Sequence, residues 1–116
     1  FVVYIMEQLA PLKGVETGRF FGGVGLKSGE ILFGMIMGNT LYFVVDDTTR
    51  PSYQDMGSRC FSYRTKKRRV EVHRFYEVPA DVLEDSEACM ALAEQSIEVA
   101  RKSAKPRKRN VRRRTR

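Results

Sequence analysis

The spacing of apolar residues predicts a helix at the start of the chain. In residues 1–12 apolar side chains recur three and four positions apart, beginning with Val2 and Ile5, as in a helix that buries one face. Pro11 and Gly14 follow, and both residue types interrupt helices. We therefore expect the first helix to end near residue 12.

Short apolar runs separated by glycine and polar residues replace this pattern between residues 15 and 45. Such runs are typical of strands joined by tight turns, because glycine readily adopts the positive φ angles that hairpin turns require. The expected turns are Gly22-Gly23, Ser28-Gly29 and Gly38-Asn39. This region predicts a meander of three or four antiparallel strands.

A short helix and a second hairpin are expected in the middle of the chain. Polar residues at 46–49, followed by Pro51, are typical of a helix start. Residues 60–64 and 70–76 are then expected to pair across the basic loop 65–69. Apolar and polar residues alternate in the second of these strands, which predicts that one face of the hairpin is exposed to water.

The last apolar pattern predicts a long helix, introduced by a turn at Pro79 and running from residue 87 to about residue 102. Acidic residues gather at its start and basic residues at its end, as the helix dipole favours. Pro106 is expected to stop this helix. Residues 104–116 contain almost no apolar side chains, so we expect a disordered basic tail there.

These elements predict one small α+β domain over residues 1–103, followed by the basic tail at residues 104–116. A chain of 116 residues can fill one hydrophobic core but not two. The order of the elements favours two layers, an antiparallel sheet of about five strands with helices mainly on one face.

The positive charge of the chain is concentrated at its C-terminal end. The formal net charge is +7, yet residues 101–116 hold ten of the 21 Lys and Arg residues and no acidic residue. The remaining hundred residues carry eleven basic and fourteen acidic side chains, a balance of −3. A mildly acidic folded body with a basic tail is therefore expected, so the overall charge is no measure of the folded surface.

The basic residues are the candidate binding groups of the sequence. They lie in the loop between the last two strands and in the tail, where they would neutralise phosphates and release counterions. The candidate contacts to DNA or RNA are Arg64, Lys66, Lys67, Arg68, Arg69, Arg101, Lys102, Lys105, Arg107, Lys108, Arg109, Arg112, Arg113, Arg114 and Arg116. The alternative is a tail that is merely solvated and binds polyanions incidentally.

Groups suited to catalysis or metal binding are sparse. His73 is the sole histidine and belongs to no catalytic motif, so we interpret it as a surface or packed imidazole. Cys60 and Cys89 lie far apart in no metal-binding spacing, and each is expected to be a small buried hydrophobic residue. Asp46 and Asp47 are expected to cap the following helix. The sequence thus predicts no enzyme activity, no metal ion and no cofactor.

The sequence predicts a cytoplasmic protein with no membrane partner. Its longest apolar runs are shorter than the roughly 18 residues that a membrane-spanning helix needs. The apolar residues 1–6 lack the preceding basic region and following cleavage site of a signal peptide. The tail has no apolar or lipidation signal to hold it at an anionic membrane. Because the chain begins with Phe rather than Met, we expect native residues upstream.

Four segments of the sequence carry a family resemblance. They are MEQLAPL, RFFGGVGL, LYFVVDDTTRPSYQDMGSRCFSY and FYEVPADVLED. The most specific elements are the turn Arg19-Phe20-Phe21-Gly22-Gly23, the run Val45 to Pro51 and the run Tyr76 to Pro79. In this order and spacing they resemble the TfoX N-terminal domain family, over residues 1 to about 101.

The resemblance implies a two-layer fold related to secretion-chaperone-like domains, and a link to the regulation of natural competence. It offers no catalytic residues to transfer to this chain. Our leading interpretation is a non-enzymatic regulatory or adaptor domain that binds an unidentified protein partner, with weak nucleic-acid affinity from the tail. The alternative is a direct, non-specific DNA- or RNA-binding protein that uses the tail and the loop 64–69. A homodimer is a further expectation.

Overall fold

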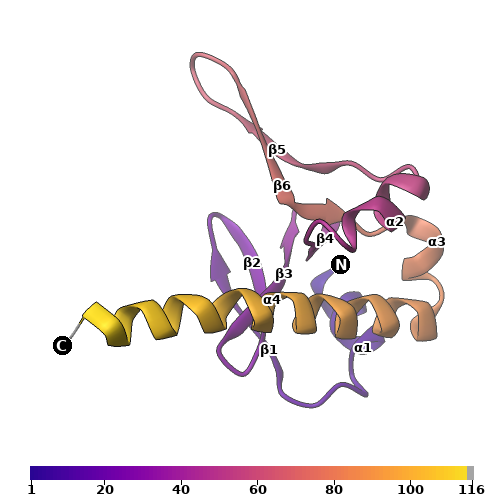
Figure 1. Cartoon of the computed structure of the whole chain (residues 1–116). Coiled ribbons are helices and arrows are strands. Elements are labelled where there is room, and N and C mark those ends of the chain that lie inside the picture. The colour runs from indigo at the N-terminus through magenta and orange to yellow at the C-terminus, as the bar shows by residue number, and fades with distance from the viewer. Residues whose placement is uncertain (115–116) are drawn as a thin grey trace.

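The computed structural model describes the backbone of residues 1–114 and the side chains of residues 1–103. Its helices and strands follow the order expected from the sequence (Figure 1). The helices are α1 (Val2–Gln8), α2 (Arg50–Asp55), α3 (Ala80–Leu83) and α4 (Ser86–Arg114). The strands are β1 (Val15–Phe20), β2 (Gly23–Ser28), β3 (Ile31–Met37), β4 (Thr40–Val44), β5 (Cys60–Arg64) and β6 (Arg69–Glu77).

The strands form one antiparallel sheet in the order β1-β2-β3-β4-β6-β5. The α+β class is confirmed. The described residues contain six strands where about five were expected, and four of them lie in residues 15–44, where three or four were predicted. The turn at Gly38-Asn39 is confirmed. The two preceding turns begin one residue away from the predicted positions, at Phe21-Gly22 and Gly29-Glu30.

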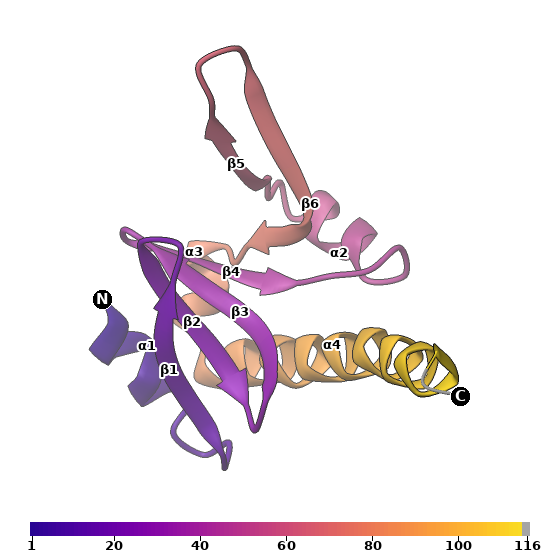
Figure 2. The same cartoon turned by 90° about the vertical axis from the view of Figure 1, so that its left-hand side faces the viewer.

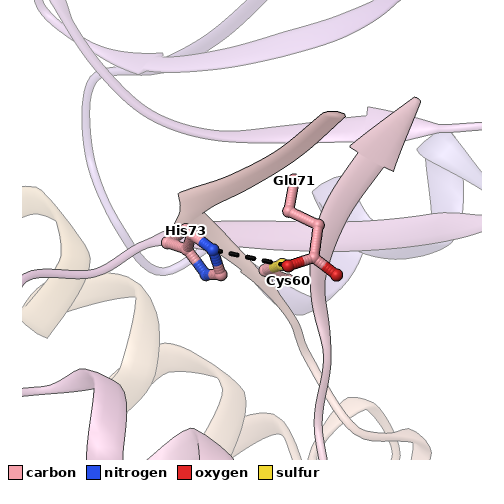
Figure 3. Close-up of side chains that lie close together, drawn as sticks. All are labelled: Cys60, Glu71 and His73. Carbon is pink, nitrogen blue, oxygen red and sulfur yellow. Dashed lines mark ion pairs between the residues drawn. The ribbon is translucent and has the colours of Figure 1, made fainter. Parts of the chain in front are cut away.

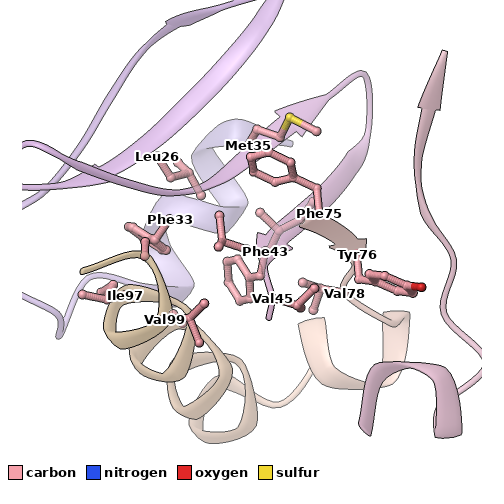
Figure 4. Packing of buried hydrophobic residues seen from close by; sticks show 14 of the residues in the cluster. Leu26, Phe33, Met35, Phe43, Val45, Phe75, Tyr76, Val78, Ile97 and Val99 are labelled. Carbon is pink, nitrogen blue, oxygen red and sulfur yellow. The ribbon is translucent and has the colours of Figure 1, made fainter. Parts of the chain in front are cut away.

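The core lies between the sheet and α4. Phe33 of β3 and Phe43 of β4 are fully buried beside Ile97 and Val99 of α4 (Figure 4). Four consecutive residues of β3 are buried, which shows that both faces of this central strand are covered. The helix spans the sheet at this point and provides the second layer of the fold (Figure 2).

The end of α3, shortly before the start of α4, is held against α1, so the N-terminal helix closes the same core. Ile5 of α1 and Leu9, which directly follows this helix, are fully buried. The Tyr4 hydroxyl and the Gln8 amide both donate hydrogen bonds to the backbone carbonyl of Leu83, with a Tyr4 distance of 2.7 Å. The predicted burial of one face of the first helix is therefore confirmed, although the helix ends at Gln8 rather than near residue 12.

The long helix departs from the prediction at its C-terminal end. α4 continues to Arg114, so the expected stop at Pro106 is wrong. A proline removes one backbone donor from a helix, and the surrounding lysine, arginine and alanine residues have high helix propensity, which favours continuation. The division of the chain into a domain at residues 1–103 and a separate disordered tail at residues 104–116 stays a prediction.

The outer part of the β5–β6 hairpin leaves the sheet and projects from the body (Figures 1 and 2). β4 pairs with β6 only at residues 75–77, whereas residues 69–72 of β6 pair with β5 alone. We call residues 60–73 the arm. One side of the arm faces the sheet and the other faces away. Because apolar and polar residues alternate along β6, apolar side chains lie on one side of the arm and polar side chains on the other.

Candidate functional site

The inner side of the arm forms an apolar cleft with the sheet. The cleft has a volume of about 610 Å³. Its lining comes from β1, the following turn and β3 on one wall and from the arm and β6 on the other: Phe20, Phe21, Met35, Met37, Phe61, Tyr63, Val72 and Phe75. Apolar concavities of this size are typical of sites that bind a ligand or a partner side chain.

Phe21 stands at the rim of this cleft in an unusual backbone conformation. It is 87% exposed, and its φ angle is +47°, followed by +82° at Gly22. Positive φ angles at both central residues are a requirement of the type I′ hairpin turn, where asparagine and glycine are favoured and a bulky residue is strained. Its ring packs edge-on against Phe20, with 4.7 Å between the ring centroids. The turn thus carries an exposed phenylalanine at a position whose positive φ angle disfavours bulky side chains.

The tip of the arm carries a compact group of cations, and five of the predicted nucleic-acid contacts lie here. The Thr65 hydroxyl oxygen accepts hydrogen bonds from the N–H groups of Lys67 and Arg68, which fixes the turn. Arg64 and Arg69 are direct cross-strand partners. Like charges in this position repel each other. All five predicted contacts at the tip are exposed: Arg64, Lys66, Lys67, Arg68 and Arg69.

Of the other predicted contacts, those from Arg101 to Arg114 belong to the end of α4, away from the tip. Arg101 is partly exposed and pairs with Glu98 at 2.8 Å, while Lys102 is exposed. The side chains of the remaining predicted contacts lie outside the described residues: Lys105, Arg107, Lys108, Arg109, Arg112, Arg113, Arg114 and Arg116. In both views the arm tip and the end of α4 point in different directions, so they form two separate basic regions (Figures 1 and 2).

The outer side of the arm brings together three side chains that the sequence analysis treated separately. Donor atoms of Cys60, Glu71 and His73 all lie within 4.8 Å of one another. His73 Nε2 is 3.5 Å from Glu71 Oε1 (Figure 3). The predicted wet face of the hairpin is confirmed, since Glu71 and His73 project outward while Val72 lines the cleft. The interpretation of His73 as a surface imidazole is confirmed, as its side chain is 59% exposed.

Sequence reasoning missed this cluster because the register of the hairpin is irregular. Cys60 pairs with Tyr76, yet the next residue of β5, Phe61, pairs with Val72. This shift leaves extra residues on β6 and carries Cys60 toward His73. The alternation of Glu71 and His73 was visible in the sequence, but nothing in it located the shift.

The two cysteines differ in their surroundings. Cys89 is fully buried, as expected, and burial raises the pKa of its thiol. Cys60 is only partly buried, so its interpretation as a buried hydrophobic residue is wrong. Burial, and next the Glu71 carboxylate, raise the pKa of the Cys60 thiol. The Arg69 guanidinium acts in the opposite direction but is outweighed.

The acidic pair before α2 has a structural role. The Asp46 carboxylate accepts hydrogen bonds from the N–H groups of Thr48 and Thr49, both at 3.0 Å. Burial opposes ionisation of Asp46, but these hydrogen bonds outweigh it and keep the pKa of the carboxyl below its usual value. Asp47 instead pairs with Arg50 at 2.7 Å. α2 begins at Arg50, and its N-cap residue Thr49 makes no side-chain capping hydrogen bond, so the predicted capping of this helix is wrong. Asp46 instead fixes the turn that precedes α2, and Asp47 forms an exposed ion pair.

The fold and the sequence agree with one family of domains. The model of the family described as TfoX N-terminal domain matches residues 7–100 of the 116. No curated protein matches the sequence. The matched range runs from α1 through the six strands into α4, and includes the cleft, the arm and the Cys60 cluster. The chain therefore belongs to the TfoX N-terminal domain family.

Proposed function

We propose that this domain is a non-enzymatic, cytoplasmic regulatory adaptor that binds a protein partner in the apolar cleft and associates weakly with nucleic acid through its basic regions. Its family supports a competence-regulator-like role. No helix among the described residues combines the length and hydrophobicity needed to cross a membrane.

The conformation of Phe21 is the observation that carries the proposal. A bulky residue in the left-handed region costs roughly 1 to 2 kcal/mol relative to glycine. Burial does not offset this cost, because the side chain is 87% exposed. Strained residues of this kind persist where they serve a function. An aromatic ring at the rim of an apolar cleft is suited to anchor a partner, since aromatic residues dominate the binding energy of interfaces.

The charges around the cleft favour a partner segment with a particular composition. Tyr63 lines the cleft and is 48% exposed, and the next residue, Arg64, begins the cationic tip. A segment with one or two large apolar side chains and flanking acidic residues would complement both the cleft and its rim. A second copy of this chain is the competing occupant.

A photo-crosslinking amino acid at position 21 tests the partner site in cells. The expected result is an adduct with one protein, which disappears when Tyr63→Ser and Val72→Ser remove the opposite wall. The matched control places the crosslinker at Val3, which is 70% exposed and lies outside the cleft. Identical adducts from positions 21 and 3 would reject the cleft as a specific site. An adduct between two copies of the chain would assign the cleft to a homodimer.

Direct binding of nucleic acid is the second candidate function. It is favoured by the cross-strand pairing of Arg64 and Arg69 at the arm tip, because a polyanion bound there would offset the repulsion between their like charges. Fluorescence anisotropy with duplex DNA at two salt concentrations tests it, with the full chain and with a chain ending at Ser103. Steeply salt-dependent binding that requires both basic regions would support an electrostatic role. An absence of binding at physiological salt would leave the protein partner as the sole proposed function.

A further inference from the structure

We propose that Cys60, Glu71 and His73 on the outer side of the arm form a binding site for a divalent transition-metal ion of the zinc class. The site is separate from the apolar cleft, which lies on the inner side of the same two strands. Its three donor groups come from β5 and β6 and lie at the base of the arm (Figure 3).

The chemistry of the donors selects the class of metal. A thiolate, an imidazole and a carboxylate together suit Zn²⁺ and the related ions Co²⁺ and Ni²⁺. Mg²⁺ and Ca²⁺ prefer oxygen donors only, so two of the three groups here would be poor ligands for them. Three protein donors leave one position of a tetrahedral ion for water or an anionic group, as in zinc sites that remain open to solvent.

The geometry needs only a small closure around the ion. With bonds of about 2.0 to 2.3 Å, the donors of a tetrahedral zinc ion lie roughly 3.2 to 3.8 Å apart. The donor atoms here lie within 4.8 Å, and His73 Nε2 and Glu71 Oε1 are already 3.5 Å apart. Glu71 and His73 are about half exposed, with side-chain exposures of 52% and 59%, so rotation about their side-chain bonds can close the remaining gap.

The charges in and around the site favour an anionic fourth ligand. A thiolate and a carboxylate together neutralise a divalent cation. Two guanidinium groups, those of Arg59 and Arg69, line the same depression of about 360 Å³. Arg69 is held across the hairpin by a 3.1 Å hydrogen bond from its Nε to the Ser62 hydroxyl. These cations would disfavour a bare metal ion but favour an anionic fourth ligand.

A bound ion would join the two strands where their pairing is irregular. Cys60 belongs to β5, and the other two donors belong to β6, on either side of the shifted register. Fixing these strands to each other would reduce the freedom of the arm relative to the sheet. The metal would thus brace the wall that Phe61 and Val72 contribute to the cleft.

Titration of the untagged full chain with Co²⁺ tests the site. We expect one ion per chain, absorption bands of tetrahedral cobalt, and a thiolate-to-cobalt charge-transfer band that Zn²⁺ abolishes by displacement. Cys60→Ser should remove the charge-transfer band. Glu71→Gln and His73→Gln should each weaken cobalt binding at least tenfold. Cys89→Ser, checked for folding by circular dichroism, is the matched control and should keep the band, because Cys89 is buried in the core.

The single histidine gives a readout that needs no substitution. All imidazole signals in the proton NMR spectrum belong to His73, and one equivalent of Zn²⁺ should shift them. Unchanged signals, or a cobalt band that survives Cys60→Ser but not Cys89→Ser, would overturn the proposal. One ion bound per two chains, with dimerisation on metal addition, would also overturn it, because the site would then lie between molecules.

Discussion

Ser96 of α4 donates a 2.9 Å hydrogen bond to the backbone carbonyl of Val44 at the end of β4. Its side chain is fully buried beside the Tyr53 hydroxyl, whose pKa burial raises to about 12. We expect Ser96→Ala to lower the free energy of unfolding by about 1 to 2 kcal/mol, because the buried carbonyl loses this donor. Urea denaturation measures the change. Ser52→Ala, at an exposed hydroxyl, is the control and should have little effect.

Phe21→Asn should separate stability from binding. Asparagine tolerates the positive φ of this turn better than phenylalanine, so we expect the unfolding free energy to rise by about 0.5 to 1 kcal/mol. The same substitution should abolish the adducts formed through a crosslinker placed at Tyr63. Gly22→Ala is the control with the opposite expected effect: alanine is strained at φ +82°, so this substitution should lower the unfolding free energy. A less stable Phe21→Asn protein would show that the phenylalanine is held by packing instead.

Replacing Arg64 and Arg69 together by glutamine should weaken DNA binding without weakening the fold. The pair is cross-strand and of like charge, so its removal should leave the thermal midpoint unchanged or slightly higher. The slope of log affinity against log salt should fall by about one for each phosphate that the variant no longer neutralises. Arg74→Gln, at an exposed arginine outside the tip, serves as the control. Unchanged DNA affinity in the double variant would show that Arg64 and Arg69 at the arm tip do not contribute to DNA binding.

The Cys60 thiol should react slowly at neutral pH and faster as the pH rises. Burial and the Glu71 carboxylate raise its pKa, so the reactive thiolate is less populated near neutrality than in an ordinary exposed cysteine. Mass spectrometry of iodoacetamide-treated, metal-free protein follows the rate at each pH. Glu71→Gln removes a negative charge and should increase the rate at a fixed pH below the pKa. Cys89 should react only after unfolding, because it is buried.

Gly34→Ala should be strongly destabilising. A Cβ atom at Gly34 would lie 2.9 Å from the Tyr42 carbonyl oxygen and 2.9 Å from the Phe43 ring, both in the neighbouring strand. We expect a loss of about 1 to 3 kcal/mol, as for other overpacked cores. Gly18→Ala is the matched control, since it also lies in a strand but has nothing within 4 Å of the added atom. Equal effects of the two substitutions in urea denaturation would contradict the packing argument.

The order and type of the elements could be predicted from the sequence because each rests on a local pattern. The three- and four-residue spacing that includes Cys89, Ala93 and Ile97 identified the buried face of α4, and all three residues are buried. The alternation in β6 identified its wet face. Such periodicities predict the observed burial because the apolar positions mark the side of a helix or strand that packs against the core.

The candidate sites depend on relationships that are not local. The cleft exists because β4 pairs with only three residues of β6, which frees the arm from the sheet. The cluster around His73 exists because the register shifts after Cys60. Phe21 directly precedes the turn predicted at Gly22-Gly23, and only the structure shows that it lies within the turn, with a positive φ angle and an exposed ring. Pairing length and register are set by the whole sheet, so sequence patterns could not supply them.

The order of the strands also bears on synthesis at the ribosome. β1, β2 and β3 pair only with strands adjacent to them in sequence, so the meander from β1 to β4 can form as soon as residues 15–44 have left the exit tunnel, before β6 is available to pair with β4. α4, which covers β3 and β4, is made much later. During that interval the nascent chain exposes the apolar face of its central strands, and it is then that molecular chaperones would be most needed to prevent aggregation.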